Sequence, residues 1–565
     1  MRTPILCVLM MCSPALGQFS LERRFSSAGQ VPDYPSGVTF STVGSYVISN
    51  SGDVFVNCRI NNPPESRGAN ATMRVAPNRI ITTVLKGGSL QTGTPSGTLL
   101  DEFSLVGLAG DRVSVVGNLY SIATGNPTGR AAVYSGNGSP FVFGLQTGTS
   151  AVIASGAYIS TFDSGSGGLP RAIVQGDDIV FWAQLAGASV TPATDSALVK
   201  ASGGTFTTIA REGFPAPGFA SGTVFGSMQW PVTVDATGAV WFTASVNGSE
   251  TAHALFRHAN GQTTLLLRGG QPATGAPFGS VFSSFGQPRV NARGEIALTA
   301  IFDYSGRSFT GIWAGTVPDL SCVLYVGAGA PGFDPAIKIS GLVLSGMDNV
   351  GRLCFGAELD GPGISYYANR LAIYMGRPGS LRVVSRMGDS IESTLPNTTI
   401  NQFIFPAIMN ERGQAAVQAV LATNGNVSSV NSSAVILLGG ARPGQILLRA
   451  GDTVSFPDGS SGALLSPEIS RSSRGNGMVG ASANDNGEFA IDCGVFGYGR
   501  SIIVAHAQLP CEADFNGDGF VDFTDFDEFV SLFEDGASGG DFNNDGFIDF
   551  TDFDAFVTAF EGGCN

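Results

Sequence analysis

The chain has 565 residues, which exceeds the size of one ordinary hydrophobic core, so we expect at least two domains or a repeat array. It contains 78 glycines and only 13% charged residues, a composition that disfavours helical packing and favours many short strands joined by tight turns. The formal net charge is −15, and we expect no nucleic-acid partner, because such partners require basic surfaces.

Residues 1–17, MRTPILCVLMMCSPALG, have the form of a secretory signal peptide. One arginine precedes an apolar stretch, and the small residues Ala15 and Gly17 suit a cleavage site. A lipoprotein anchor at Cys12 is the alternative, although bulky Met11 precedes it. No other run approaches the roughly 18 apolar residues that span a bilayer. We therefore expect a secreted protein, extracellular or attached to the cell surface, without a transmembrane segment after signal removal.

Residues 18–510 repeat one pattern about every 60 residues: a turn containing glycine, an apolar strand, a second strand and a segment rich in Arg and Gly. Each interval has room for four strands of 5–6 residues. Four-stranded units around an axis are typical of β-propeller blades. The sequence thus predicts a mainly β, propeller-like ring of about eight repeats, with seven as the alternative. The turn glycines are Gly52, Gly110, Gly176, Gly238, Gly294, Gly351, Gly413 and Gly487.

The two ends of this region indicate ring closure. The eighth repeat lacks its Arg-Gly-rich segment, and residues 25–30 align with that segment of other repeats. The N-terminal segment would then complete the last unit and remove an exposed sheet edge. Cys58 and Cys493 occupy equivalent places in the first and eighth repeats, so we hypothesise a Cys58–Cys493 disulfide and a Cys322–Cys354 disulfide, with buried free thiols as the alternative. The region resembles glycine-rich repeat proteins of planctomycete-type bacteria.

Residues 511–565, called the C-terminal module below, carry the whole excess of negative charge: 15 acidic residues and no Lys or Arg. Two loops, DFNGDGFVDFTD and DFNNDGFIDFTD, start 27 residues apart and offer oxygen atoms at positions 1, 3, 5, 7, 9 and 12, as Ca²⁺ requires. We predict two Ca²⁺ ions, bound by Asp514, Asn516, Asp518, the Phe520 carbonyl, Asp522, Asp525, Asp541, Asn543, Asp545, the Phe547 carbonyl, Asp549 and Asp552.

Each loop is followed by a predicted amphipathic helix of about nine residues. Phenylalanine and valine recur at i, i+3, i+4 and i+7 from Phe526 and again from Phe553. Thr524 with Asp527, and Thr551 with Asp554, resemble capping boxes. Such short helices need each other and the ions for stability.

The module has two copies of a loop followed by a helix, without a helix entering the first loop, and this arrangement resembles a type I dockerin. It resembles more closely the dockerin-like tail of planctomycete-type proteins, which ends in Gly-Cys, here Gly563-Cys564. The resemblance implies that the oxygen ligands carry over position by position and that a cohesin-like protein is the partner, although the helices here are shorter and richer in Phe. A cell-surface component is the alternative partner. Cys511 and Cys564 bracket the module, so they are predicted to form a disulfide, or Cys564 stays free for covalent attachment.

No catalytic motif is found, and His253 and His258, five residues apart, are interpreted as strand and turn residues rather than as a metal pair. We therefore predict a non-catalytic surface or extracellular protein that is anchored or assembled through its calcium module. The alternatives are a scaffold for protein partners and a carbohydrate-active enzyme of glycoside hydrolase type or a polysaccharide-binding subunit. The four Trp residues are a poor supply for sugar stacking and weigh against the polysaccharide alternative.

Overall fold

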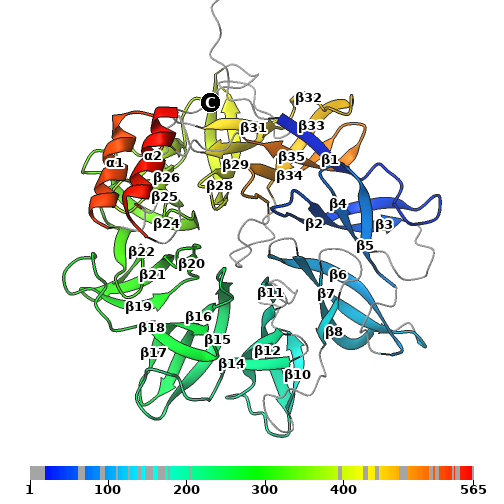
Figure 1. Ribbon diagram of the computed structural model, residues 1–565, viewed down its shortest axis with the longest axis horizontal. Coiled ribbons are helices and arrows are strands. Elements are labelled where there is room, and N and C mark those ends of the chain that lie inside the picture. The colour runs from blue at the N-terminus through cyan, green and yellow to red at the C-terminus, as the bar shows by residue number, and fades with distance from the viewer. Residues whose placement is uncertain are drawn as a thin grey trace, which may run out of the picture.

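In the computed structural model, eight antiparallel sheets stand around a common axis and form a β-propeller (Figure 1). The prediction of a mainly β ring of four-stranded repeats is confirmed. The structure describes residues 20–61, 70–88, 96–109, 112–124, 127–136, 142–146, 157–162, 172–175, 178–202, 205–391, 397–423, 431–438, 444–469, 482–507, 513–515, 521–536, 540, 542 and 547–562.

We number the sheets as blades 1 to 8 in the order in which the chain enters them. Blade 1 contains β2 (Thr39–Ile48), β3 (Val54–Asn61), β4 (Asn70–Val75) and β5 (Ile81–Lys86), and blade 2 contains β6 (Thr98–Ala109), β7 (Arg112–Ser121), β8 (Pro127–Gly136) and β9 (Val142–Gln146). Blade 3 contains β10 (Ala157–Phe162), β11 (Ala172–Gln175), β12 (Asp178–Gly187), β13 (Ser196–Ser202) and β14 (Thr205–Arg211). Blade 4 contains β15 (Thr223–Val234), β16 (Val240–Gly248), β17 (Ala252–Ala259) and β18 (Gln262–Arg268).

Blades 5 to 8 follow the same plan, and the last one also receives the first strand of the chain. Blade 5 contains β19 (Val281–Phe285), β20 (Arg289–Val290), β21 (Ile296–Tyr304), β22 (Arg307–Gly315) and β23 (Ser321–Tyr325). Blade 6 contains β24 (Lys338–Met347), β25 (Leu353–Asp360), β26 (Leu371–Gly376) and β27 (Arg382–Arg386), and blade 7 contains β28 (Thr398–Met409), β29 (Ala415–Thr423), β30 (Ser433–Leu438) and β31 (Gln445–Arg449). Blade 8 contains β32 (Thr453–Ser455), β33 (Ser461–Glu468), β34 (Glu488–Val495), β35 (Gly499–His506) and β1 (Ser20–Ser26).

The predicted turn glycines connect the first long strand of a blade to the second. Six of them have φ between 77° and 86°, a region that glycine enters without steric cost. In five of these six turns the residue three positions before the glycine is Asp or Asn, which accepts hydrogen bonds from two backbone N–H groups of the turn, as at Asp235 and Asn410. In blade 1 this position is Ser49, whose hydroxyl accepts from the Asp53 N–H. Gly110 and Gly176 lie outside the described residues. The sequence repeat is thus an Asx-turn repeat.

These turns are also bonded to one another from blade to blade. Asn291 Nδ2 in blade 5 donates to the Asp348 carbonyl in blade 6 over 3.2 Å, and Asn410 Nδ2 in blade 7 donates to the Asn484 carbonyl in blade 8 over 2.9 Å. Asn484 Nδ2 then donates to the Ser49 carbonyl in blade 1 over 2.8 Å. A chain of side-chain-to-backbone hydrogen bonds therefore continues across the joint between the ends of the propeller.

The Arg-Gly-rich segments lead from the outer strand of one blade to the first strand of the next. In three of these segments the arginine donates to a backbone carbonyl 17 or 18 residues upstream in the same blade: Arg211 to Thr194, Arg386 to Asn369 and Arg449 to Asn431. Arg268 donates to the Glu250 carboxylate instead. A charge-assisted bond of this kind holds the loop between the second and third long strands. The marker seen in the sequence is thus a structural device of the repeat.

The N-terminal strand closes the ring, as the alignment predicts. β1 pairs with β35 in antiparallel register from Ser20↔His506 to Ser26↔Ser501, so it is the outer strand of blade 8. The strand is longer than predicted and begins before Phe25, which is buried between blades 8 and 1. Because blade 8 combines strands from both ends of the chain, the ring has no open seam between them.

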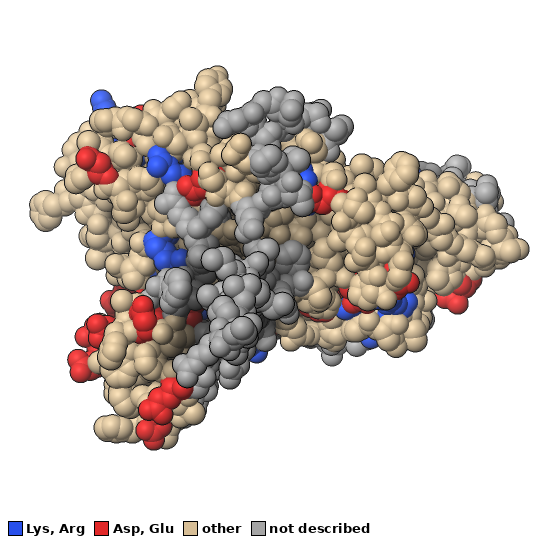
Figure 2. Space-filling view, turned by 90° about the horizontal axis from the view of Figure 1, so that it is seen from above, with Lys and Arg blue, Asp and Glu red and all other residues tan. Residues whose placement is uncertain are grey.

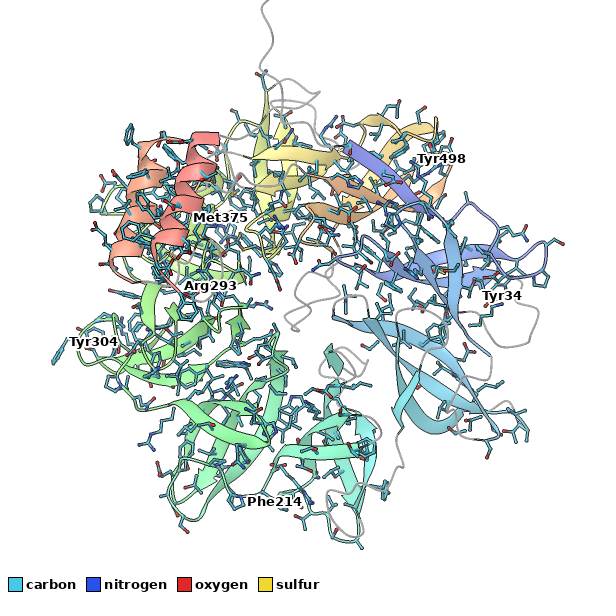
Figure 3. All side chains as sticks on the ribbon, viewed as in Figure 1. Tyr34, Phe214, Arg293, Tyr304, Met375 and Tyr498 are labelled. Atoms are coloured by element: carbon cyan, nitrogen blue, oxygen red, sulfur yellow. The ribbon has the colours of Figure 1, made fainter. Side chains whose placement is uncertain are left out.

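Apolar side chains lie between neighbouring blades (Figure 3), and several hydrophobic clusters join two adjacent sheets, such as those of blades 8 and 1. Tyr304 and Phe214 lie at the outer rim in this view, and both are exposed at 37% and 45%. The largest buried residues include Trp182 and Trp313. Burial between sheets about 10 Å apart supplies the main stabilisation of such an architecture.

The predicted Cys58–Cys493 and Cys322–Cys354 disulfides are wrong, because all four cysteines are free. Equivalent positions of successive blades point in the same direction around the ring. Cys58 therefore faces blade 8 and Cys493 faces blade 7, with the sheet of blade 8 between them. Cys322 packs toward blade 4 and Cys354 toward blade 7, so two sheets separate this pair. Cys511 and Cys564 lie outside the described residues.

Two helices, α1 (Phe523–Glu534) and α2 (Phe550–Gly562), follow the propeller and lie over blade 6 (Figure 1). Acidic side chains gather on the part of the molecule that projects at the lower left of Figure 2, where the two helices lie. Across the described residues, no helix is both long and apolar enough to span a membrane.

Candidate functional site

The helices of the C-terminal module begin directly at the predicted calcium ligands. Asp522 is the N-cap of α1: its side chain accepts a hydrogen bond from the Thr524 backbone N–H over 2.8 Å, and Asp525 Oδ2 accepts one from the Asp522 N–H over 2.9 Å. This reciprocal pair is a capping box. It stands two residues before the predicted Thr524–Asp527 pair, which is wrong because the helix begins at Phe523, so Thr524 lies inside it and donates its own backbone N–H to Asp522.

The second helix repeats this arrangement. Asp549 Oδ1 accepts from the Thr551 N–H over 2.8 Å, and Asp552 Oδ2 accepts from the Asp549 N–H over 2.9 Å. The predicted Thr551–Asp554 box is wrong for the same reason. Hydrogen bonds from Thr524 and Thr551 lower the pKa of Asp522 and Asp549 from the ordinary value, so both caps are charged at neutral pH.

Phenylalanine side chains hold the two helices together. The rings of Phe529 and Phe556, which are equivalent in the two repeats, stack with centroids 4.1 Å apart and planes at 15°. Both side chains are fully buried, and Phe515 packs edge-on against both. The predicted apolar face of each helix is confirmed: the periodic phenylalanines pack into one small core without contributing to the propeller core.

The structure describes half of the predicted calcium ligands. Asp525 and Asp552, at position 12, are fully buried, whereas Asp522 and Asp549, at position 9, are exposed at the helix N-termini. Six predicted ligands lie outside the described residues: Asn516, Asp518, Phe520, Asp541, Asn543 and Asp545. Within the part of the chain that the structure describes, no three His, Cys, Asp or Glu side chains gather as a metal site. The two Ca²⁺ sites stay a prediction.

The chemistry of the described donors fits a hard cation. Asp525 and Asp552 bring carboxylates into a module that has no Lys or Arg of its own. Burying a carboxylate is costly unless it is hydrogen-bonded and its charge is compensated. The capping bond from the Asp522 or Asp549 N–H supplies part of that compensation and orients the carboxylate. Oxygen donors alone, with no sulfur or imidazole, are what Ca²⁺ prefers.

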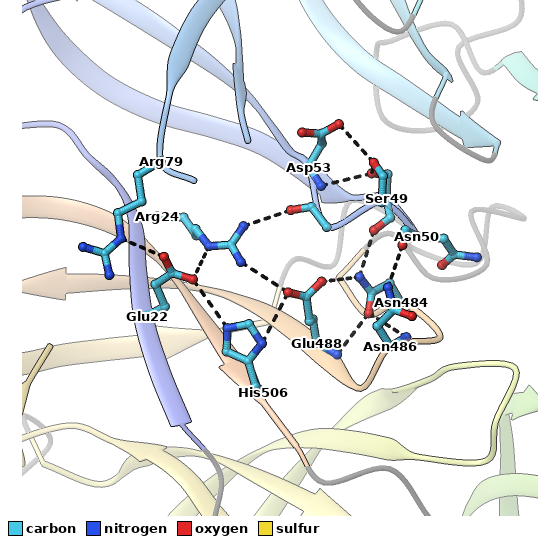
Figure 4. A network of polar contacts seen from close by, with 12 residues as sticks. Glu22, Arg24, Ser49, Asn50, Asp53, Arg79, Asn484, Asn486, Glu488 and His506 are labelled. Carbon is cyan, nitrogen blue, oxygen red and sulfur yellow. Dashed lines mark hydrogen bonds and ion pairs between the residues drawn. The ribbon is translucent and has the colours of Figure 1, made fainter. Parts of the chain in front are cut away.

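A second cluster of charged residues lies where β1 joins blade 8 (Figure 4). The guanidinium of Arg24 is 5% exposed and lies between Glu22 and Glu488, and its Nη1 donates to the Gly52 carbonyl over 3.0 Å. Arg79 Nε from blade 1 donates to Glu22 over 2.7 Å. The cluster therefore joins β1, β34 and blade 1.

His506 completes this cluster, with its two ring nitrogens 3.5 Å from Glu22 and 3.3 Å from Glu488. Burial raises the pKa of Glu22, but hydrogen bonds and charge from Arg79 and Arg24 outweigh it and leave that pKa below 4.5. The charged side chains of this cluster contact one another, and Arg24 also contacts the backbone. We interpret it as the structural lock of the ring, not as a catalytic site.

His253 and His258 do not form a metal pair. Both lie on β17, but five residues place them on opposite faces of the strand. His253 Nδ1 accepts from the Phe285 N–H in blade 5 over 3.2 Å, and His258 Nδ1 lies 2.8 Å from Thr263 Oγ1 in the same blade. Burial lowers the pKa of both, with Lys200 adding to the effect at His258. Both histidines therefore lie on a strand, and neither is the turn residue that the sequence suggested for one of them.

One important residue had no signal in the sequence. Arg377, just after β26, contacts Phe515 and Glu528 of the C-terminal module. It lies in GRPGS, which reads as an ordinary turn. A contact between residues more than 130 positions apart leaves no local pattern.

Comparisons with known proteins give a family and distant structural similarities. A puromycin hydrolase is 10% identical with a TM-score of 0.33, covering 79% of this chain, and the chain spans only 61% of that protein's length. YCF48 from Cyanidioschyzon merolae is 10% identical, with coverages of 72% and 97% and a TM-score of 0.28. The polysaccharide lyase Uly1 is 11% identical, with coverages of 73% and 92% and a TM-score of 0.31.

These values are too low to transfer an activity, and no curated protein matches the sequence. One family model, described as "Family of unknown function (DUF7453)", matches residues 29–315 and 304–473. The matched region includes β2 to β33 and therefore most of the propeller. Because the match covers well over half of the chain, the chain belongs to this family of unknown function.

Proposed function

We propose that this protein is a secreted, non-catalytic β-propeller that is anchored or assembled through a calcium-dependent, dockerin-like C-terminal module. The observation that carries the proposal is the pair of fully buried carboxylates at equivalent positions, Asp525 and Asp552. Each is held by the backbone N–H of the residue three positions before it. These residues end two loops that differ at two of twelve positions, and duplication of such a loop is typical of paired calcium modules.

In this proposal the Asp residues at positions 9 and 12 both bind Ca²⁺ and shape the start of a helix. The position-9 residues, Asp522 and Asp549, cap the helices, and the position-12 residues close the loops onto the helix N-termini. A bound Ca²⁺ would supply the positive charge that the module's own side chains lack. Loading would then tighten the packing of Phe529 on Phe556, because the same Asp residues link loop and helix. The resulting rigid module is the part that would engage a protein or cell-surface component.

Calcium titration of the full chain after chelator treatment tests the metal sites. The wild-type chain is expected to bind two ions with measurable heat and to gain helicity. Asp525→Asn and Asp552→Asn keep the side-chain shape, and each is expected to remove one site. Asp527→Asn, which changes an exposed residue of the same helix, is the matched control and is expected to keep both. If the wild-type chain shows neither heat nor added helicity, the calcium sites do not exist.

Capture of partners from cell-envelope material, with and without chelator, tests the anchoring role. We expect recovery of a partner that depends on Ca²⁺ and is lost in the Asp525→Asn/Asp552→Asn variant. Capture that is unchanged by both chelator and substitution would show that the module does not mediate attachment.

A further inference from the structure

The C-terminal module contacts blade 6 of the propeller through one turn. Ser380 Oγ, between β26 and β27, donates to Glu528 Oε1 of α1 over 3.2 Å. Arg377 Nη1 lies 3.8 Å from the same oxygen, and the Arg377 guanidinium lies over the Phe515 ring, 4.6 Å from its centroid. A carboxylate and an aromatic ring face of the module therefore both lie against one guanidinium of the propeller.

Arg377 is unusual because it is charged, 7% exposed and only partly hydrogen-bonded. Its Nε donates to the Val350 carbonyl over 3.0 Å, but neither Nη atom has a hydrogen-bond partner among the described residues. Burial, and then the positive charge of Arg352, lower its pKa to about 10. A guanidinium in this state is stabilised by nearby negative charge: Asp348 of blade 6 and Glu528 of the module both act on it, and the Phe515 ring adds a cation–π contact.

The charges of the two surfaces are complementary. Arg293, Arg352 and Arg377 come from the turn side of blades 5 and 6, and Arg352 and Arg377 both feel the field of Glu528. Arg293 lies toward the centre of the ring in Figure 3. The C-terminal module has 15 acidic residues and no basic one. Electrostatic attraction of this kind fixes orientation and partner choice.

We propose that blade 6 carries a docking surface, formed by Arg377 and Ser380, for the chain's own C-terminal module, and that docking covers the Glu528 face of α1. The chain length between the two parts favours the same chain over a second copy. Five residues separate Ala507 from Ala513, so the two lie at most about 22 Å apart. A tether this short gives an effective concentration in the millimolar range or above.

The docked arrangement has a consequence for partner binding. A partner that used the Glu528 face of α1 would compete with Arg377, whereas one that used α2 would not. The docked module is thus shielded on one face until that contact is released. The contacts of Arg377 and Ser380 with the module involve no calcium ligand, so docking can be present or absent independently of the proposed calcium sites.

Hydrogen exchange of the full chain tests the docking, with the amides of residues 379–381 in blade 6 as the readout. Glu528→Arg leaves the blade unchanged and reverses the charge that faces Arg377. We expect exchange about tenfold faster in this segment, equivalent to about 1.4 kcal/mol. Glu534→Arg makes the same charge change at an exposed position of the same helix and is expected to leave the segment protected.

A charge swap distinguishes the docking contact from general disturbance of the helix. Arg377→Glu alone is expected to lose protection at residues 379–381, and addition of Glu528→Arg is expected to restore it. Equal exchange in Glu528→Arg and Glu534→Arg, or no restoration in the double variant, would overturn the proposal. Protection that increased with protein concentration would show that the occupant is a second copy and would likewise overturn it.

Discussion

The lock at the ring closure makes a strong prediction about stability. Arg24→Ala removes a guanidinium that is 5% exposed and leaves two carboxylates behind, on Glu22 and Glu488. Breaking a buried ion pair by deleting one partner costs about 3–5 kcal/mol. Glu22 keeps its bond to Arg79, whereas Glu488 loses its arginine, so we expect a loss near the lower end, about 3 kcal/mol. Arg24 also joins β1 to Gly52 of blade 1, so the substitution weakens the contact between blades 8 and 1 that closes the ring.

Urea unfolding followed by tryptophan fluorescence measures this loss, because Trp182 and Trp313 are buried in the propeller. Arg307→Ala, at an exposed strand end, is the control and is expected to cost under about 0.5 kcal/mol. A double-mutant cycle with Glu488→Gln should show coupling, because the neutral amide no longer needs the arginine. The lock would be refuted if Arg24→Ala cost no more than Arg307→Ala, or if the two losses simply added.

Two further predictions concern titration. The folded pKa of Glu22 lies below 4.5, so its contribution to stability is present above that value and is lost as the pH falls through the folded pKa. The urea midpoint should therefore fall on acidification below pH 4.5, and less steeply in Glu22→Gln; equal slopes would contradict this. Burial raises the pKa of Cys58, Cys354 and Cys493 to about 12, so alkylation at pH 8 should modify them only after unfolding. Rapid labelling of the native chain would show that these thiols are accessible.

The blade repeat was predictable because its signals are local. A turn such as Asp348–Gly351 needs an Asx side chain, a glycine at positive φ and apolar alternation after it, and all three are adjacent in sequence. Closure by β1 was predictable for the same reason, since the N-terminal segment carries the marker that the last repeat lacks. The helix faces of the C-terminal module followed from periodicity, and their pairing through Phe529 and Phe556 followed from duplication.

The incorrect predictions, and the residue that the sequence did not indicate, depend on where side chains lie after folding. Cys58 and Cys493 are equivalent by sequence, but equivalence in a ring means the same orientation, so a sheet separates them instead of bringing them together. The capping boxes were misplaced by two residues because the sequence offers Thr and Asp donors and acceptors at both registers. Arg377 could not be found, because only folding brings Phe515 and Glu528 to it.

The ring closure and the docking of the C-terminal module are separable features of one chain. The lock joins blades 8 and 1 through Arg24, whereas docking joins α1 to blade 6 through Arg377, and the two share no contact residue. Interactions without shared partners are close to additive. Release of the module would therefore uncover its acidic face without opening the propeller. A propeller that stays closed while its tail is released can present the module to a partner and keep its blades folded.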